Sequence, residues 1–230
     1  LGTSAVSSGS ASVALGSSAE ASGYQSTAVG AASESYGNYS SAFGLNSYSF
    51  GEYSSAFGYS AYAGGQYSLS LGAGSAATGL YSSSMGYNST ATNEYASALG
   101  GNSEASGYAS TALGASSRAS GDGSVAIGIA LAGNTYSSAL GFGAQATGNS
   151  STALGTGSSS TGDGSTSLGV NTTASGEGST ALGSLSTSNG LGSTALGVNS
   201  VSTGTVSVSL GADSYASGDF STALGETSTA

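Results

Sequence analysis

Apolar residues recur along this chain at an interval of fourteen residues, and each one is followed directly by glycine. The series begins at Leu1-Gly2 and contains seventeen copies, with one thirteen-residue step between Gly128 and Gly141. We call the repeated apolar residues the leucine column. After Leu1 its members are Leu15, Val29, Phe43, Phe57, Leu71, Met85, Leu99, Leu113, Ile127, Leu140, Leu154, Leu168, Leu182, Leu196, Leu210 and Leu224.

A second glycine divides most copies in half, as at Gly9 and Gly23. Two copies carry asparagine there instead, at Asn93 and Asn134. Asparagine is among the residues that best tolerate the left-handed backbone conformation for which glycine is commonly used. We therefore expect both glycines of each copy to form corners with positive φ.

The segments between these corners predict short strands. The consensus S-T-A-L-G-x-x-S-x-A-S-G-x-x is nearly complete over residues 110–121 and 151–162. Helices need about 12–15 residues to be even marginal in water, and a glycine every seven residues opposes them. Small and larger side chains alternate between the glycines, as in short strands. Two strands and two corners per copy predict an all-β solenoid of 14-residue coils, stacked about 4.8 Å apart.

Two packings of such a coil satisfy the alternation. In the first, the leucine column fills the tube and is the structural core. In the second, the tube holds only Ser and Ala, and the leucine column lies outside. We favour the first, because Ser and Ala alone bury little apolar area to offset the entropy of ordering the backbone. Either packing leaves one long face smooth or apolar, so we expect the chain to form a homo-oligomer.

Composition excludes most kinds of chemistry. The 230 residues include no His, Cys, Pro or Trp, and Arg118 is the only basic residue against eleven acids. The chain therefore has no histidine base, no thiolate and no nitrogen or sulfur metal ligand, and we predict no enzyme, no cofactor and no metal site. A net charge of −10 opposes nucleic-acid binding. No apolar run reaches about 18 residues, so we expect no membrane insertion by this segment.

Tyrosines are the candidate binding residues. Twelve of the fourteen fall in the first half of the chain. In one interpretation they stack from coil to coil and stabilise a corner, by roughly 0.2–1 kcal/mol per pair. In the other they form an adhesive surface for protein or sugar, since tyrosine offers a large amphipathic contact at low entropic cost. Five recur in register, at Tyr39, Tyr53, Tyr67, Tyr81 and Tyr95, with Tyr48 and Tyr62 nearby.

The repeat core resembles a known family. It stands as Ser124-Val125-Ala126-Ile127-Gly128, and as S-T-A-L-G from Ser110, Ser151, Ser179, Ser193 and Ser221. This core, the period and the half-period glycine are similar to the YadA-like heads of trimeric autotransporter adhesins, and the resemblance covers the whole chain. It implies a left-handed parallel β-roll assembled as a homotrimer, carried on a stalk at the bacterial outer membrane.

From this resemblance we expect an adhesin head: a rigid trimeric rod at the bacterial cell surface or outside the cell. It would attach to host matrix, cells, surfaces or other bacteria through a protein or glycan ligand. The alternative is a purely structural segment of an extracellular filament or phage tail fibre, without a ligand of its own. The chain, a single repeat domain over residues 1–230, begins and ends inside a repeat, so we expect it to be a segment of a longer fibrous protein.

Overall fold

The structure is a computed structural model, and it describes residues 2–230. These residues form strands and turns without a helix. They divide into two compact units, Leu1–Ser117 and Arg118–Ala230, and we describe each unit by itself. Unit 1 contains strands β1 to β16, and unit 2 contains β17 to β32. A single domain over residues 1–230 stays a prediction.

Each coil contributes one two-residue strand and one three-residue strand. In unit 1 the two-residue strands are β1 (Val6–Ser7), β3 (Glu20–Ala21), β5 (Glu34–Ser35), β7 (Tyr48–Ser49), β9 (Tyr62–Ala63), β11 (Ala76–Ala77), β13 (Thr90–Ala91) and β15 (Glu104–Ala105). The three-residue strands are β2 (Val13–Leu15), β4 (Thr27–Val29), β6 (Ser41–Phe43), β8 (Ser55–Phe57), β10 (Leu69–Leu71), β12 (Ser83–Met85), β14 (Ser97–Leu99) and β16 (Thr111–Leu113).

Unit 2 repeats the same alternation. Its two-residue strands are β17 (Arg118–Ala119), β19 (Leu131–Ala132), β21 (Gln145–Ala146), β23 (Ser159–Ser160), β25 (Thr173–Ala174), β27 (Thr187–Ser188), β29 (Val201–Ser202) and β31 (Tyr215–Ala216). Its three-residue strands are β18 (Val125–Ile127), β20 (Ser138–Leu140), β22 (Thr152–Leu154), β24 (Thr166–Leu168), β26 (Thr180–Leu182), β28 (Thr194–Leu196), β30 (Val208–Leu210) and β32 (Thr222–Leu224).

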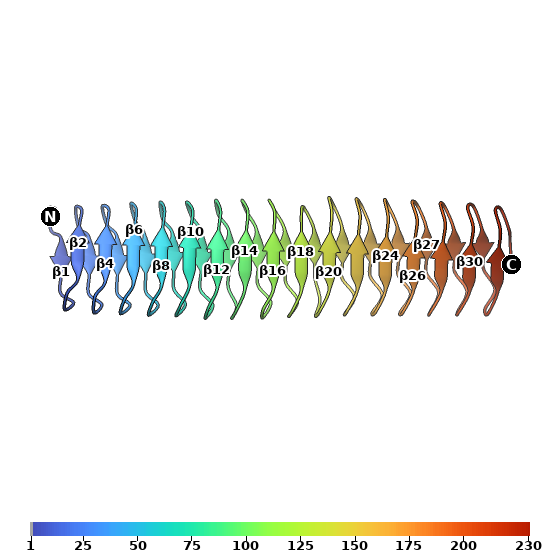
Figure 1. Cartoon of the computed structure of the whole chain (residues 1–230), viewed down its shortest axis with the longest axis horizontal. Helices are drawn as coiled ribbons and strands as arrows, with labels where there is room; N and C mark the ends of the chain where they lie inside the picture. Colours follow the sequence, from blue (N-terminus) through green and yellow to red (C-terminus); the bar gives the residue numbers. More distant parts are fainter. Residues whose placement is uncertain (1) are drawn as a thin grey trace. The chain divides into compact units, whose positions relative to one another are not determined.

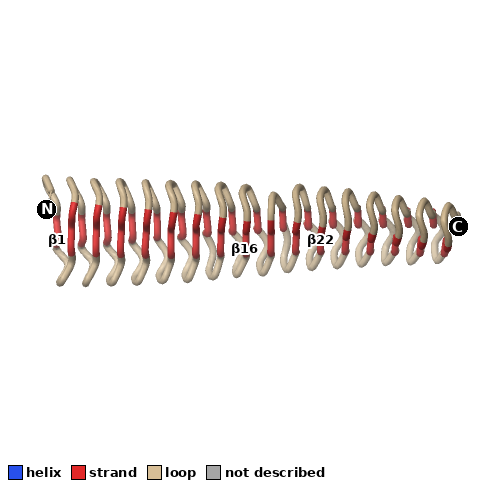
Figure 2. Tube along the Cα trace, turned by 45° about the horizontal axis from the view of Figure 1, so that its top comes forward, coloured by secondary structure: helices blue, strands red, loops and turns tan. Residues whose placement is uncertain are grey.

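Within each unit the strands form two parallel sheets, one of odd-numbered and one of even-numbered strands. Figure 1 shows the even strands as upward arrows, and Figure 2 shows how a turn at each end links the two sheets. Strand pairing follows the sequence period, so that Leu99 lies opposite Leu113 in the neighbouring strand. The prediction of an all-β parallel solenoid is confirmed.

The interior of the coil holds only small side chains. The middle residue of every even strand is buried, as are the second residues of the odd strands from β3 onward. These residues are Ala or Ser throughout, and Ala14, Ala19, Ala21 and Ala28 form one buried cluster from both sheets. The two backbone layers therefore lie close together, and Thr172 is the largest side chain that is fully buried among the described residues.

The prediction that the leucine column fills the tube is wrong. Its members point outward from the even sheet, and none of them is buried; Leu154, for example, is 36% exposed. The physical reason is the narrow tube, which Ala methyls and Ser hydroxyls already fill. The residues displaced from the predicted core are Leu15, Val29, Phe43, Phe57, Leu71, Met85, Leu99, Leu113, Ile127, Leu140, Leu154, Leu168, Leu182, Leu196, Leu210 and Leu224.

Serine can occupy this interior because the turns supply hydrogen-bond acceptors. The Ser33 hydroxyl donates to the Gly30 carbonyl at 2.9 Å, and the Ser40 hydroxyl donates to the Gly37 carbonyl at 2.6 Å. Ser35 and Ser40 also bond to each other across the tube, at 2.6 Å. A buried hydroxyl without a partner would cost about 1–3 kcal/mol. The recurring serine three residues after a glycine therefore closes a corner while filling the core.

Most corners are hydrogen-bonded turns of four residues that start at a glycine, or at Asn93 and Asn134 in two copies. The Ser40 amide donates to the Gly37 carbonyl, and the third residue of that turn, Tyr39, has φ +58°. This combination is typical of a type II turn. The third position carries positive φ in nearly every turn, and its Asn and Gly residues are the ones that suit that conformation best. Examples are Asn46, Asn88, Asn102, Asn171, Asn199, Gly157 and Gly164.

The prediction of positive φ at both repeated glycines is therefore correct for only one of them. Gly44, after the leucine column, has φ +136°, whereas Gly37 and the other half-period glycines do not have positive φ. Gly37 is required for space instead, because a Cβ there would overlap the carbonyl oxygen of Gly51 in the next coil. Asn93 and Asn134 occupy this half-period position, and each side-chain amide donates to a carbonyl of the next coil.

The thirteen-residue copy lacks part of one corner, as the missing residue predicts. Only Ile129 lies between Gly128 and Ala130, where other copies have two residues, and Ala130 takes the buried small position. Gly128 has φ +90°, compared with +133° at Gly141, and no third turn residue with positive φ follows it. Strand β20 still pairs in register with β18.

Two serines at the same repeat position test the role of the core hydroxyls. Ser26 and Ser40 are both fully buried, but the Ser26 hydroxyl has no hydrogen-bond partner among the described residues. We expect Ser40→Ala to lower the free energy of unfolding by about 1–3 kcal/mol, because it leaves Ser35 without its partner. Ser26→Ala should leave stability unchanged or raise it. Denaturant unfolding at one protein concentration measures both, and equal losses would contradict this account.

Candidate ligand-binding surface

Five tyrosines form a row along the half-period corner of unit 1. We call Tyr39, Tyr53, Tyr67, Tyr81 and Tyr95 the tyrosine ladder. Each is the third residue of its turn, with φ between +55° and +58°. The amide of Tyr53 donates to the carbonyl of Asn38 in the preceding coil, at 2.9 Å, and the other ladder residues bond in the same way. These bonds hold a bulky residue in a conformation that normally favours glycine.

The ladder rings stack face to face. Successive ring centroids from Tyr39 to Tyr95 are 4.8, 5.1, 4.8 and 5.3 Å apart, with interplanar angles of 2–6°. Tyr24 and Tyr108 end the stack with edge-on contacts. Because each face within the stack covers its neighbour, the ring faces inside the stack are closed to solvent and the exposed surface lies at the ring edges. Its members are 42–46% exposed.

Acidic and amide side chains flank the ladder at the second residue of four of its five turns, and Leu80 takes this place in the turn of Tyr81. Glu52 precedes Tyr53, and the Gln66 amide donates to the Glu52 carboxylate at 2.8 Å. Desolvation, followed by the charges of neighbouring groups that include Glu52, raises the pKa of Tyr53. Desolvation and Glu94 raise the pKa of Tyr95. The phenols of Tyr53 and Tyr95 therefore stay neutral at physiological pH and can donate hydrogen bonds.

Tyr48 and Tyr62 do not belong to the ladder. They lie in β7 and β9 on the outer face of the odd sheet, directly opposite each other. There they contact Phe50, with centroid distances of 6.0 and 5.7 Å, and Phe50 stacks on Tyr36 at 5.1 Å. We call Tyr36, Tyr48, Phe50 and Tyr62 the sheet cluster.

The sequence prediction missed Tyr36 and Phe50. The signal was present, because the two residues are fourteen positions apart and so stack in register. A search for repeated tyrosines does not reveal it, because Phe50 takes the place of a tyrosine in this row.

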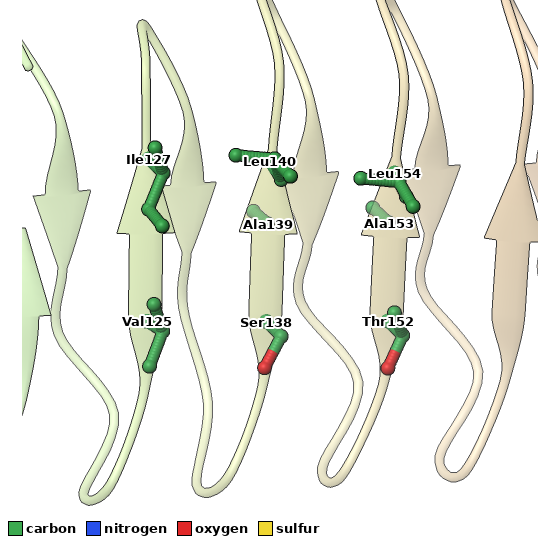
Figure 3. Close-up of a pocket in the computed structure, with 8 residues that line it drawn as sticks. All are labelled: Val125, Ile127, Ser138, Ala139, Leu140, Thr152, Ala153 and Leu154. Carbon is green, nitrogen blue, oxygen red and sulfur yellow. The ribbon is translucent and has the colours of Figure 1, made fainter. Parts of the chain in front are cut away.

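The leucine column forms an apolar face on the even sheet. In unit 2 this face contains a groove of about 260 Å³ between neighbouring strands. Figure 3 shows Ile127, Leu140 and Leu154 along one row of it, and Val125, Ser138 and Thr152 along a second row. Ala139 and Ala153 form its floor. Such a face is typical of a surface that packs against another protein.

Metal-binding clusters are absent from the described chain. Over residues 2–230, no group of three or more His, Cys, Asp or Glu side chains lies close enough together to hold a metal ion. The same residues contain no helix long and apolar enough to cross a membrane. Asp163 has a pKa below its usual value because the backbone and side chain of Asn149 donate hydrogen bonds to it. Its carboxylate is therefore part of a turn-to-turn contact.

Comparison with known proteins gives one family and one similar structure of note. The family model described as YadA head domain repeat (2 copies) matches residues 1–19, 21–47, 51–75, 77–103, 105–129, 132–158, 160–186, 188–214 and 202–226. The crystal structure of the collagen-binding domain of the Yersinia adhesin YadA is similar, with 25% identity and a TM-score of 0.34. The match covers 70% of this chain and 68% of that chain. No curated protein matches the chain.

The sheet cluster predicts a stability change at high pH. Burial, followed by contacts with Glu20 and Glu34, raises the pKa of Tyr36 to about 12. In the unfolded chain tyrosine loses its proton near pH 10, so the folded state holds that proton more tightly. Stability should therefore fall as pH rises from about 10 to about 12. Tyr36→Phe keeps the ring stack and should make this fall smaller in denaturant unfolding; an unchanged fall would contradict the assignment.

Proposed function

The chain belongs to the family of YadA head domain repeats, and from this premise we propose that it is the ligand-binding head of a bacterial surface adhesin. It attaches the cell to host matrix, to other cells or to surfaces through a protein or glycan ligand. This function places the chain outside the cell.

The exposed tyrosine ladder is the observation that carries this proposal. A purely structural stack needs only ring faces, yet all five tyrosines of this unbroken row are 42–46% exposed. Each hydroxyl can donate and accept a hydrogen bond, and each ring edge adds apolar contact. A row of such groups, one per coil, suits an extended ligand that lies along the coils.

We further propose that the chain assembles as a homotrimer through the leucine column. The column supplies one apolar side chain per coil within each unit, and its small neighbours, such as Ser138 and Thr152, permit close approach. A continuous apolar face of this kind is unfavourable in water unless another protein covers it. The odd sheet lies on the other side of the coil, so the sheet cluster stays accessible in such an assembly.

A pair of five-residue variants tests the adhesive role of the ladder. Changing all five ladder tyrosines to Phe keeps the stack and removes the hydroxyls. This variant should keep its stability and lose at least about tenfold in adhesion to immobilised collagen or neutral glycans, because the hydroxyl contacts are gone. Changing all five to Ser should also lower stability by about 1–4 kcal/mol, because four stacked pairs are lost. Ser150 occupies the same turn position, so the turn accommodates serine.

The matched control is Tyr87→Phe, which removes one exposed hydroxyl at the opposite corner and should leave adhesion unchanged. Circular dichroism confirms that each variant keeps its strands. If wild-type chain adheres and both ladder variants adhere equally well, the ladder is a structural stack only. If wild-type chain adheres to none of the probes, the chain is better described as a spacer segment of a filament.

A further inference from the structure

The sheet cluster leaves one aromatic ring face uncovered. The ring of Tyr36 stacks on Phe50 on one side, at 5.1 Å. The residue at the same position in the preceding coil is Ser22, which is too short to cover the other side. Tyr36 is 37% exposed. The stack therefore ends in an accessible ring face on the outer surface of the odd sheet.

Two carboxylates border this open face. Glu20 in β3 lies directly opposite Glu34 in β5, and both carboxylates lie close enough to the Tyr36 phenol to raise its pKa. The Ser22 hydroxyl donates to Glu20 Oε1 at 3.0 Å, which holds that carboxylate beside the open position. Like charges directly opposite each other on neighbouring strands are unfavourable. A positively charged ligand at this place would relieve that repulsion.

The other end of the sheet cluster, at Tyr62, is covered, so only one end of the stack can offer a free ring face. The ring of Tyr62 lies over Gly64, where an added Cβ would come within 2.6 Å of the ring. Tyr62 also contacts Phe50, at a centroid distance of 5.7 Å. The free ring face of the stack is therefore the one beside Glu20.

Unit 1 supplies no cation of its own. Its sequence contains five glutamates and neither Lys nor Arg. The negative potential around Glu20 and Glu34 is thus uncompensated by any side chain of the unit, and it attracts positively charged partners.

We propose that the open face of Tyr36, with Glu20 and Glu34, binds an ammonium or guanidinium group from a basic segment of a partner protein. The cation lies over the ring, where the π-system attracts positive charge, and its N–H groups donate to the two carboxylates. A neutral sugar would gain little from the carboxylates and would find only one free ring face. This cation site is separate from the tyrosine ladder, so it goes beyond the adhesive role proposed above.

Fluorescence anisotropy of a labelled octa-arginine peptide with the full chain at low ionic strength tests the proposal. The double variant Glu20→Gln with Glu34→Gln should weaken binding by about fivefold or more, because it removes both charge partners. Tyr36→Thr should weaken it by about threefold or more, through loss of the ring. Both changes fit the fold, because Gln145 and Thr78 occupy the corresponding positions in other coils. Added salt should weaken binding to wild-type chain.

The matched control is Glu104→Gln. Glu104 occupies the same sheet position, but Thr92 and Ser106 replace the aromatic rings beside it. It should change binding by no more than about twofold, through net charge alone. An equal loss in Glu104→Gln, or unchanged binding in either site variant, would overturn the proposal. So would binding of a neutral chito-oligosaccharide that depends on Tyr36 but not on the carboxylates. None of these outcomes bears on adhesion through the ladder.

Discussion

The narrow space between the two sheets is the constraint on which the rest of this structure depends. The short corners bring the backbone layers so close that Ala and Ser fill nearly all of the space between them, and Thr172 is the largest fully buried side chain of the described residues. A core of this kind buries little apolar area. Backbone hydrogen bonds from coil to coil therefore contribute a larger share of the folded state's stability than in an ordinary domain. The buried hydroxyls are compatible with this core because the turn carbonyls accept their hydrogen bonds, as Gly37 does from Ser40.

Every large side chain must then lie outside, and the coil sorts these side chains by position. Leucine-column residues gather on the even sheet, the tyrosine ladder follows the half-period corner, and the sheet cluster lies on the odd sheet. Each surface is built from one repeat position, so its chemistry extends over as many coils as keep the same residue. Function in such a chain therefore depends on rows of residues that repeat from coil to coil. Residues only three positions apart, such as Phe50 and Tyr53, belong to different surfaces.

The sequence predicts the coil length, the parallel pairing and the stacked tyrosines, because each follows directly from a period of fourteen residues. It does not predict which side of a strand faces inward. The alternation shows that Ala14 and Leu15 lie on opposite sides of the strand, but it does not show which side faces the interior. That choice depends on the distance between the sheets, which is a three-dimensional property. The sequence also does not distinguish a glycine needed for positive φ, such as Gly44, from one needed for close approach, such as Gly37.

The direction of the leucine column is the central claim, and single cysteines test it most directly, because the chain has no native cysteine. Leu154→Cys places a thiol on the apolar face, and Ala153→Cys places one inside the coil. With a short thiol-specific cross-linker, Leu154→Cys should yield covalent dimers from a particle of three times the 21.4 kDa chain mass, and Ala153→Cys should stay unreactive. A monodisperse monomer whose Leu154→Cys thiol is protected, while that of Ala153→Cys reacts, would contradict the account.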